Sequence, residues 1–340
     1  MMLIGVDPHK ATHTAVAVDD REQPVARLQV RSDRHQVPRL LAWAETLDTE
    51  RLWAVESANG LGRLLSQQLV AAGEQVVDVP ATLAARVRLF GPTRAAKNDP
   101  NDALSTAIAG LRHDELRPVV VEDHTAVLRL LSDRHRDLGS LRTQTVCRLH
   151  VLLRELIPGG APVRLRADRA AVLLRRVRPT SPVEVERKRL AQDLLVDIRR
   201  LDRDLDDLRT RITAAVTASG TTLVELHGVG PVVAALVLGQ VGDPRRFPTR
   251  DRFASYNGTA PIEASSGPRV RHRLNLRGNR RLNHAMHLIA VTQIAHDTPG
   301  RAYFDRKLAE GKSRKEALRS LKRRISDAVW RQLQADLEPA

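Results

Sequence analysis

The stretch LIGVDPHKATHTAVAVD, residues 3–19, decides the fold class, because it holds two short apolar runs on either side of a polar turn. A third run, VARLQV at residues 25–30, follows after another polar break. Short runs rich in β-branched residues and bounded by turn residues are typical of strands. The opening of the chain therefore predicts three consecutive strands.

Downstream, the pattern changes to an alternation of strands and helices. A fourth strand is predicted in RLWAVE, residues 51–56, and a fifth in QVVDVP, residues 75–80. Helical periodicity is seen at residues 36–47, 61–72, 82–90 and 100–111. Three strands followed by strand–helix alternation is the order of an RNase H-like fold, of the Holliday-junction-resolvase type, although other α/β domains share parts of it.

The middle of the chain predicts a helical arm. Residues 122–157 are helical in pattern and end at a Pro-Gly-Gly breaker. Ser181, Pro182 and Glu184 then have the form of a helix start with a serine cap. The apolar residues that follow recur at spacings of three and four: Leu190, Leu194, Ile198, Leu201, Leu205, Leu208 and Ile212. This seam predicts a coiled coil that packs against itself or a second protomer; the alternative is a long helix lying on the domain core.

The last third predicts short helices joined by glycine turns. LHGVGPVVAALVL, residues 226–238, fits a helix-hairpin-helix whose Gly228 and Gly230 offer backbone N–H groups to a phosphate. A structural turn between buried helices fits the same residues. The predicted class is α/β plus α, with an RNase H-like domain at residues 1–115, a helical arm at 116–220 and a mostly helical domain at 221–340.

Composition narrows the class of protein. Hydrophobic residues make up 42% of the 340, which predicts a packed globular chain rather than a disordered one. The single cysteine, Cys147, excludes an internal disulfide and a cysteine-based zinc cage. No apolar run is long enough to span a bilayer and no secretory leader is visible, so we expect a cytoplasmic protein without a membrane partner.

The charge is uneven along the chain. Residues 241–340 contain 21 Lys and Arg against 10 Asp and Glu, so +11 of the net +15 lies there. Clustered cations favour a polyanion partner, because neutralising phosphates releases condensed counterions. A membrane surface could attract the same charge, but no strongly amphipathic, lipid-anchored segment accompanies it. The charge therefore favours nucleic acid.

Four carboxylates stand where an RNase H-like fold would bring them together. Asp7 ends the first strand and Glu56 ends the fourth, while Asp99 and Asp102 share one face of a helix that begins near Pro100. Converging carboxylates cannot all stay ionised without cations, and their hard oxygen ligands suit Mg²⁺. Two such ions could stabilise the attacking and leaving oxygens of one phosphodiester. Alternatively, Asp99 is a helix cap and Glu56 a surface acid, whereas Asp7 needs a partner in any case.

A second group of polar residues lies within residues 261–285. Ser265 and Ser266 precede Gly267-Pro268 in a turn, and a serine in a positive field could attack a phosphate, although such a turn is usually an ordinary loop. No acid occurs from residue 264 to 296. The arginines that suit phosphate oxygens there, the arginine stripe, are Arg269, Arg271, Arg273, Arg277, Arg280 and Arg281.

These blocks, taken in order, resemble the DEDD transposases of insertion-sequence family 110. IGVDPHKATHTAVAV is similar to the family's opening strands, WAVES to the segment of the glutamate, and KNDPNDA to its Lys-x-Asp-x-x-Asp-Ala signature. Residues 226–267 resemble its C-terminal domain, and GNRRLNHAM and GKSRKEALRSLKRRI its later helices. The sequence departs from the family's pattern at one point: the glycine that follows Glu56, here Gly60, is shifted by one residue from its place in the family.

The resemblance implies a recombinase that excises and integrates an insertion sequence. It implies that Asp7, Glu56, Asp99 and Asp102 hold metal, and that Ser266 forms a phosphoserine link to DNA. It also implies two half-sites from different protomers of a dimer or tetramer, and a guide RNA that pairs with donor and target DNA. The alternatives are a metal-only resolvase or nuclease and a non-enzymatic nucleic-acid-binding protein. An actin-like ATPase is not favoured, because the sequence shows no glycine-rich phosphate loop where such an enzyme needs one.

Overall fold

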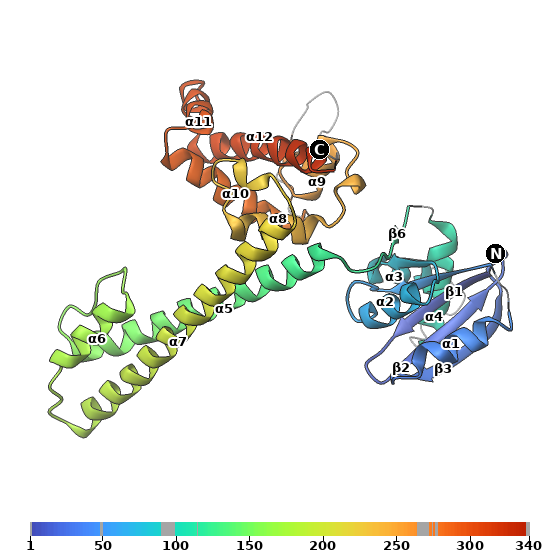
Figure 1. Ribbon diagram of the computed structural model, residues 1–340, viewed down its shortest axis with the longest axis horizontal. Helices are drawn as coiled ribbons and strands as arrows, with labels where there is room; N and C mark the ends of the chain where they lie inside the picture. The colour runs from blue at the N-terminus through green and yellow to red at the C-terminus, as the bar shows by residue number, and fades with distance from the viewer. Residues whose placement is uncertain are drawn as a thin grey trace. The chain divides into compact units, whose positions relative to one another are not determined.

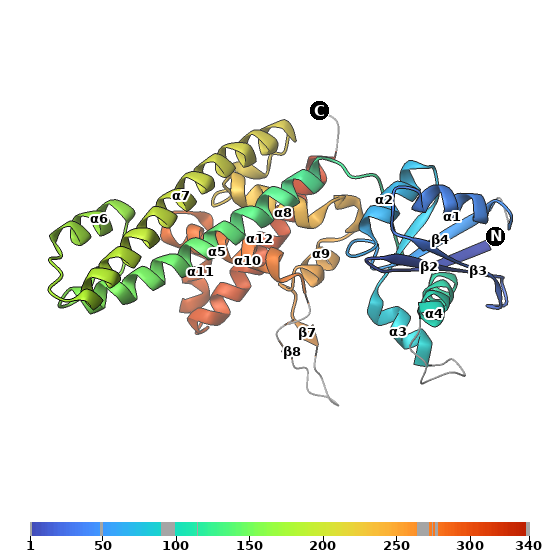
Figure 2. The same ribbon diagram turned by 90° about the horizontal axis from the view of Figure 1, so that it is seen from below.

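The computed structural model describes residues 2–47, 50–89, 99–113, 115–263, 272–273, 275 and 278–337. The chain forms two compact units, which meet between Glu122 and Asp123. The first unit is a sheet covered by helices, and the second is helical except for one small hairpin (Figures 1 and 2). The predicted class, α/β followed by α, is confirmed.

The first unit is built on a mixed sheet with the strand order β3-β2-β1-β4-β5-β6. The first three strands are antiparallel, β4 and β5 run parallel to β1, and β6 is antiparallel to β5. The strands are β1 (Met2–Pro8), β2 (Thr12–Val18), β3 (Pro24–Arg31), β4 (Arg51–Glu56), β5 (Val76–Val79) and β6 (Arg117–Pro118). This order is that of an RNase H-like domain. The two-residue strand β6 is an addition that the sequence pattern did not predict.

Two layers of helices cover this sheet. Alternate residues of β1 and β4 belong to different cores: Ile4 and Val55 pack on the face covered by α1 and α2, whereas Leu3 and Ala54 pack on the face of α3 and α4. The separation of the two helix pairs is visible in Figure 2. The helices are α1 (Gln36–Ala44), α2 (Arg63–Ala71), α3 (Ala81–Leu89) and α4 (Asp99–Arg112).

The close approach of α4 to the sheet depends on small residues. A Cβ atom placed on Gly5 of β1 would lie 2.2 Å from the carbonyl oxygen of Ala103 and 2.7 Å from the Cβ of Ala107. One placed on Gly110 would lie 2.7 Å from the Cβ of Ala54 in β4. Helix α4 therefore rests almost directly on the backbone of β1, with its first turn toward the end of that strand.

The second unit begins with the helical arm. Helix α5 (His124–Leu156) runs outward, α6 (Ala167–Arg176) lies at the far end, and α7 (Pro182–Ala218) returns beside α5 (Figure 1). The pair is antiparallel, because Arg187 is paired with Glu155 near the tip and Arg142 with Asp202 nearer the base. Helix α6 lies in a stretch for which the sequence pattern indicated no element.

The predicted start of α7 is confirmed. Ser181 Oγ accepts a hydrogen bond from the Glu184 backbone N at 3.3 Å, and the Glu184 carboxylate reaches back to the Thr180 backbone N at 2.7 Å. Pro182 occupies the first turn, where its missing N–H costs nothing.

The buried seam of α7 matches the predicted one from Ile198 to Ile212, but not at its start. Ala191 is fully buried there, whereas Leu190 is 47% exposed. The register is a heptad through Ala191, Ile198, Leu205 and Ile212, and Leu195 is buried in place of Leu194, so the first two predicted positions are each displaced by one residue. The seam packs against α5 of the same chain, and pairing with a second protomer stays a prediction.

The remaining helices enclose a large core together with the base of the arm. They surround the apolar helix α8, and Leu201, Leu208 and Val216 of α7 belong to the same core. The predicted boundary at residue 220 falls between segments that share this core. The elements are η1 (Leu223–Glu225), α8 (Pro231–Val241), η2 (Pro244–Arg246), α9 (Arg250–Tyr256), β7 (Ile262–Glu263), β8 (His272–Arg273), α10 (Arg280–Ala295), α11 (Pro299–Ala309) and α12 (Arg314–Ala335).

No helix within the described residues combines the length and the apolar character that crossing a bilayer requires. Cys147 lies exposed on α5 and is a free thiol.

Candidate metal and nucleic-acid sites

Strand register brings Asp7 and Glu56 to the same end of the sheet. Val6 of β1 pairs with Val55 of the parallel strand β4, so the residues that follow them lie side by side. Side chains alternate between the faces of a strand. Asp7 therefore lies on the face of the sheet that α4 covers, as Leu3 and Gly5 do. Glu56 lies on the same face, as Ala54 does.

The first turn of α4 supplies the other two carboxylates. Asp99 and Asp102 both lie in that turn, three residues apart and hence on one face of the helix. The positive end of the helix dipole favours negative charge at this place. Because α4 packs on Gly5 through Ala103, its first turn is directed toward Asp7.

His9, which was not among the predicted site residues, joins this group. Its Nε2 atom lies 3.4 Å from Asp7 Oδ2 and 3.2 Å from Asp99 Oδ1. Ligand atoms from these three residues lie within 4.8 Å of one another, which is close enough to share a metal ion. The signal was present in the sequence, since a residue two positions after Asp7 is directed to the same side of an extended chain.

The environment of Asp7 opposes its negative charge. The side chain is buried, and within the described part of the chain its Oδ2 atom has no hydrogen-bond partner. Burial raises the pKa of Asp7 to about 6, although nearby His9 acts to lower it. The charges of Glu56, Asp102 and Asp99 raise this pKa further. Each of the other three predicted acids thus lies close enough to act on Asp7, and a cation would relieve this repulsion.

Asp102 already has a positively charged partner. Arg88, in the last turn of α3, forms an ion pair with the Asp102 carboxylate. The pair is largely shielded from solvent, with the Asp102 side chain 12% exposed. Arg88 thereby balances part of the negative charge of the cluster, a role that nothing in the sequence pattern indicated.

The loop after Glu56 shows how the displaced glycine is accommodated. Ser57 adopts a left-handed backbone conformation with φ of 51°, and its carbonyl oxygen accepts hydrogen bonds from the N atoms of Gly60 and Gly62. A Cβ on Gly62 would lie 2.7 Å from Val55 and 3.1 Å from Pro8. The turn therefore folds tightly back over the strand ends, and Glu56 keeps its place.

The predicted nucleophile and half of the arginine stripe fall outside the described residues: Ser265, Ser266, Arg269, Arg271 and Arg277. Three arginines of the stripe are described. Arg273 and Arg280 are exposed, whereas Arg281 forms an ion pair with Asp133 of α5. Arg281 thus holds α10 against the arm.

The glycine turn before α8 serves packing at one of its two glycines. Gly228 has φ of 91°, and a Cβ on it would lie 3.1 Å from the carbonyl oxygen of Ile289 in α10. Gly230 caps α8 and faces open space. The element before the turn is the single turn η1, so the helix-hairpin-helix and its phosphate contact stay predictions.

Comparison with known proteins places these features in a family. One family description, "Transposase", with the DEDD and IS110 designations, matches residues 4–158. A second, "Transposase IS116/IS110/IS902 family", matches residues 220–305. The first match spans the acidic cluster, and the second spans the segment with Ser266.

Relatives of similar length support both matches. The 44.8 kDa protein of insertion element IS116 from Streptomyces clavuligerus is 28% identical over 97% of this chain and 94% of its own length. The 43.6 kDa protein of IS110 from Streptomyces coelicolor is also 28% identical, over 96% and 92%. Among solved structures, RuvC of Thermus thermophilus is 18% identical over 35% of this chain and all of its own, with a TM-score of 0.28.

Proposed function

The chain belongs to the IS116/IS110/IS902 family of transposases, and we propose that it recombines DNA with a divalent-metal carboxylate centre in the first unit and Ser266 in the second. The observation that carries the metal centre is Asp7, a buried carboxylate whose Oδ2 atom has no hydrogen-bond partner among the described residues and lies near three further acids. The transposase assignment removes the non-enzymatic alternative and leaves the metal-only nuclease as the competing mechanism.

The residues of the cluster fit a divalent cation. Asp7, Glu56, Asp99 and Asp102 would supply the oxygen ligands that Mg²⁺ prefers. When bound, such an ion lowers the pKa of a coordinated water or hydroxyl group and stabilises negative charge on a phosphate. His9 lies against Asp7 and Asp99, where it fixes the direction of both carboxylates or serves as a nitrogen ligand. Arg88 limits the negative charge that the cluster holds without the ion.

The serine step is a phosphoryl transfer. The Ser266 oxygen would form a bond to phosphorus, and the bond from phosphorus to a deoxyribose oxygen would break. The proton that Ser266 gives up balances the one that the departing deoxyribose oxygen takes up to leave as a hydroxyl group. A protein–DNA phosphodiester conserves the energy of the broken bond, so rejoining needs no cofactor. By the family resemblance, a guide RNA selects donor and target, and the acids and the serine of one active site come from different protomers.

A covalent-trapping experiment tests the mechanism. Labelled donor DNA is incubated with the full chain and Mg²⁺, and covalent adducts are separated on a denaturing gel. Ser266→Ala is expected to bind DNA but form no adduct, and Ser265→Ala to retain most of it. An adduct from Ser266→Ala together with none from Ser265→Ala would move the nucleophile by one residue. Cleavage by wild type with no adduct would favour the metal-only mechanism.

A further inference from the structure

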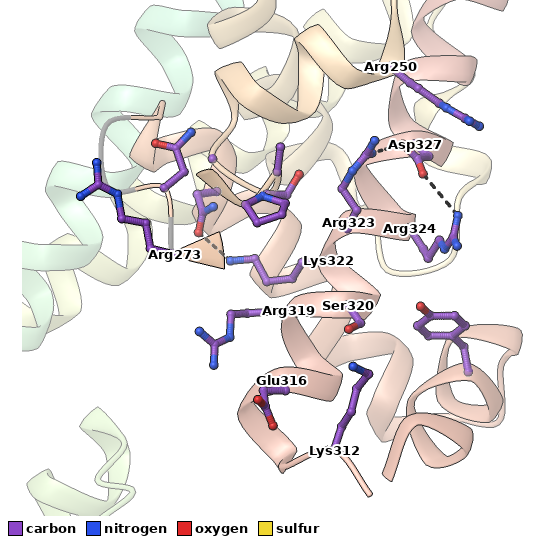
Figure 3. A pocket seen from close by; sticks show the side chains of 17 residues that line it. Arg250, Arg273, Lys312, Glu316, Arg319, Ser320, Lys322, Arg323, Arg324 and Asp327 are labelled. Atoms are coloured by element: carbon purple, nitrogen blue, oxygen red, sulfur yellow. Dashed lines mark hydrogen bonds and ion pairs between the residues drawn. The ribbon is translucent and has the colours of Figure 1, made fainter. Parts of the chain in front are cut away.

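A basic pocket of about 610 Å³ lies in the second unit, between α12, α10 and the loops that flank the β7–β8 hairpin (Figure 3). Its volume is in the range of ligand-binding pockets. Its acidic lining residues are Glu316 and Asp327. Its basic lining residues are Arg250, Arg273, Lys312, Arg319, Lys322, Arg323 and Arg324. None of the residues from α12 was a candidate from the sequence.

The two acids of the pocket are already engaged. The Glu316 carboxylate accepts a hydrogen bond from the backbone N of Ser313 at 2.9 Å, which caps α12. Asp327 forms an ion pair with Arg323, and Arg324 lies 3.8 Å from it. Figure 3 shows these three side chains of α12 as one linked group. Arg323 also pairs with Asp251, so the two arginines of this group are balanced by two carboxylates.

Two other cations of α12 form no ion pair among the described residues, although the hydrogen bonds of Glu316 and, after them, the charge of nearby Arg319 lower the pKa of that carboxyl. Within the described residues, no carboxylate lies within ion-pair distance of Lys322 or Arg319, and both side chains project away from Asp327 in Figure 3. The same holds for Arg273, which lines the pocket from β8. An excess of cations over carboxylates in one concave site creates a positive potential that attracts an anion.

Lys322 is held in position by a buried polar chain. Its Nζ atom donates a hydrogen bond to Asn283 Oδ1 at 2.6 Å, and Asn283 Nδ2 donates to the carbonyl oxygen of Asn257 at 2.9 Å. Asn257 is in turn bonded to Ser326 at 2.8 Å, and both residues are fully buried. Burial lowers the pKa of Lys322. An ammonium has three donors, so at least two remain for a ligand.

Two loops approach each other closely at the pocket. A Cβ on Gly278 would lie 2.5 Å from the Cα of Gly258, so two loops cross there at backbone distance. Pro261 and Arg273 line the pocket from either side of residues 264–271.

We infer that this pocket binds a phosphodiester group of a nucleic-acid backbone, with Lys322 and Arg319 as the contacting cations. The choice of nucleic acid as the ligand rests on the proposed function. Arginine offers a fork that fits two phosphate oxygens, and a fixed lysine supplies a point charge beside it. Asn283 is a positioning residue, because it acts on the ligand through Lys322.

The test is equilibrium binding by the full chain at several salt concentrations, in the presence of a chelator. A short labelled DNA duplex and an RNA of the same sequence are titrated separately. Each lost phosphate contact lowers the slope of log affinity against log salt by about 0.9 for duplex DNA and about 0.7 for a single strand. Lys322→Gln and Arg319→Gln are each expected to lower the slope by about one contact.

Two control variants make the result specific. Lys322→Arg keeps the charge and is expected to restore the wild-type slope. Lys315→Gln removes a charge from an exposed residue of the same helix that does not line the pocket, and is expected to leave the slope unchanged. Thermal unfolding checks that each variant folds. If Lys322→Gln does not fold, the salt slope of Arg319→Gln, a change at an exposed residue, decides whether the pocket binds the phosphate.

The outcomes separate this inference from the proposed function. A lower slope on DNA assigns the pocket to DNA, one on RNA assigns it to RNA, and one on both assigns it to nucleic-acid backbone in general. Unchanged slopes on both, or an equal loss in Lys315→Gln, would overturn the inference. Since no strand is cut in a chelator, a failed serine mechanism leaves this result standing, and a failed pocket leaves the adduct test standing.

Discussion

The acidic cluster of the first unit and the basic pocket of the second are opposite in sign but alike in one respect. In each, burial disfavours the charge of a central residue: it raises the pKa of Asp7 to about 6 and lowers the pKa of Lys322. A protein that only needed to fold would place neutral residues at both positions. The comparison indicates that each charge is retained for a ligand of the opposite sign.

The two sites differ in how they are built. The acidic cluster depends on the close contact of α4 with β1, beside which β4 supplies Glu56, whereas the pocket is assembled from α9, α10, α12 and two crossing loops. A single substitution far from any ligand can therefore dismantle the first site more readily than the second.

The largest expected effect is that of Gly5→Ala. Its new Cβ would lie 2.2 Å from a backbone oxygen of α4, so the helix must move away from β1. We expect a loss of about 3 kcal/mol in the free energy of unfolding, at the upper end for overpacking, and loss of DNA cleavage. Urea denaturation measures the first effect. Gly139→Ala is the control, because nothing lies within 4 Å of its new methyl on α5 and a gain of about 0.5–1 kcal/mol is expected. Equal stability of Gly5→Ala and wild type would show that α4 is not held as described.

A smaller effect is expected from Asp7→Asn in metal-free protein. The folded-state pKa of about 6 lies above the ordinary value of 3.8, so the folded protein holds this proton more tightly than the unfolded chain. Wild-type stability should therefore fall, relative to the variant, as the pH rises from about 4 to 6. Above that range the variant should be more stable by at most about 3 kcal/mol, while recombination is lost.

Denaturation at both ends of this pH range, with and without Mg²⁺, checks the prediction. Added Mg²⁺ should stabilise wild type and not the variant. A variant that is less stable than wild type at high pH without metal would mean that Asp7 is a structural residue, and the parallel with Lys322 would fail.

Lys322→Met probes the same principle at the basic site. Because burial lowers the pKa of Lys322, replacing its ammonium with an apolar group of similar length is expected to leave stability unchanged or to raise it by under about 1 kcal/mol. Nucleic-acid binding should weaken at the same time. Thermal unfolding and anisotropy titration measure the two quantities, and a marked loss of stability would mark Lys322 as a structural residue instead.

The smallest effect distinguishes two neighbouring arginines of the predicted stripe. Arg281→Gln removes the ion pair with Asp133 and should cost about 0.2–1 kcal/mol without changing the salt slope of binding. Arg280→Gln should lower the salt slope of binding and leave the free energy of unfolding unchanged, because Arg280 is exposed on α10. If both variants change only the slope, Arg281 leaves Asp133 for phosphate when nucleic acid binds.

The sequence was most informative where periodicity and position together determine the geometry. Asp7 and Glu56 could be predicted as neighbours because each ends a short apolar strand, and the spacing of Asp99 and Asp102 placed both on one helical face. The pairing of Arg88 with Asp102 was not predictable, since it depends on how α3 packs against α4. The pocket escaped notice for the same reason, because Asn283 and Lys322 meet only through tertiary packing.

The seam of α7 shows a further limit. Leu190 and Ala191 are adjacent, and hydrophobicity alone favours the leucine for the interior, yet the alanine is buried and Leu190 is 47% exposed. The heptad that runs back from Ile212 through Leu205 and Ile198 reaches position 191. The larger side chain was thus a poorer guide than the repeat.

The antiparallel course of α5 and α7 has a consequence for the size of this protein. Glu155 opposite Arg187 and Arg142 opposite Asp202 show that the chain travels out and back along one line. Equal lengths deleted from both helices, in whole heptads, would shorten the excursion and leave its two ends where they join the rest of the unit. The apolar cluster at the tip, which includes Leu153, Leu174 and Ile198, is separate from the one at the base. The length of the arm can therefore vary without changing the residues of either site.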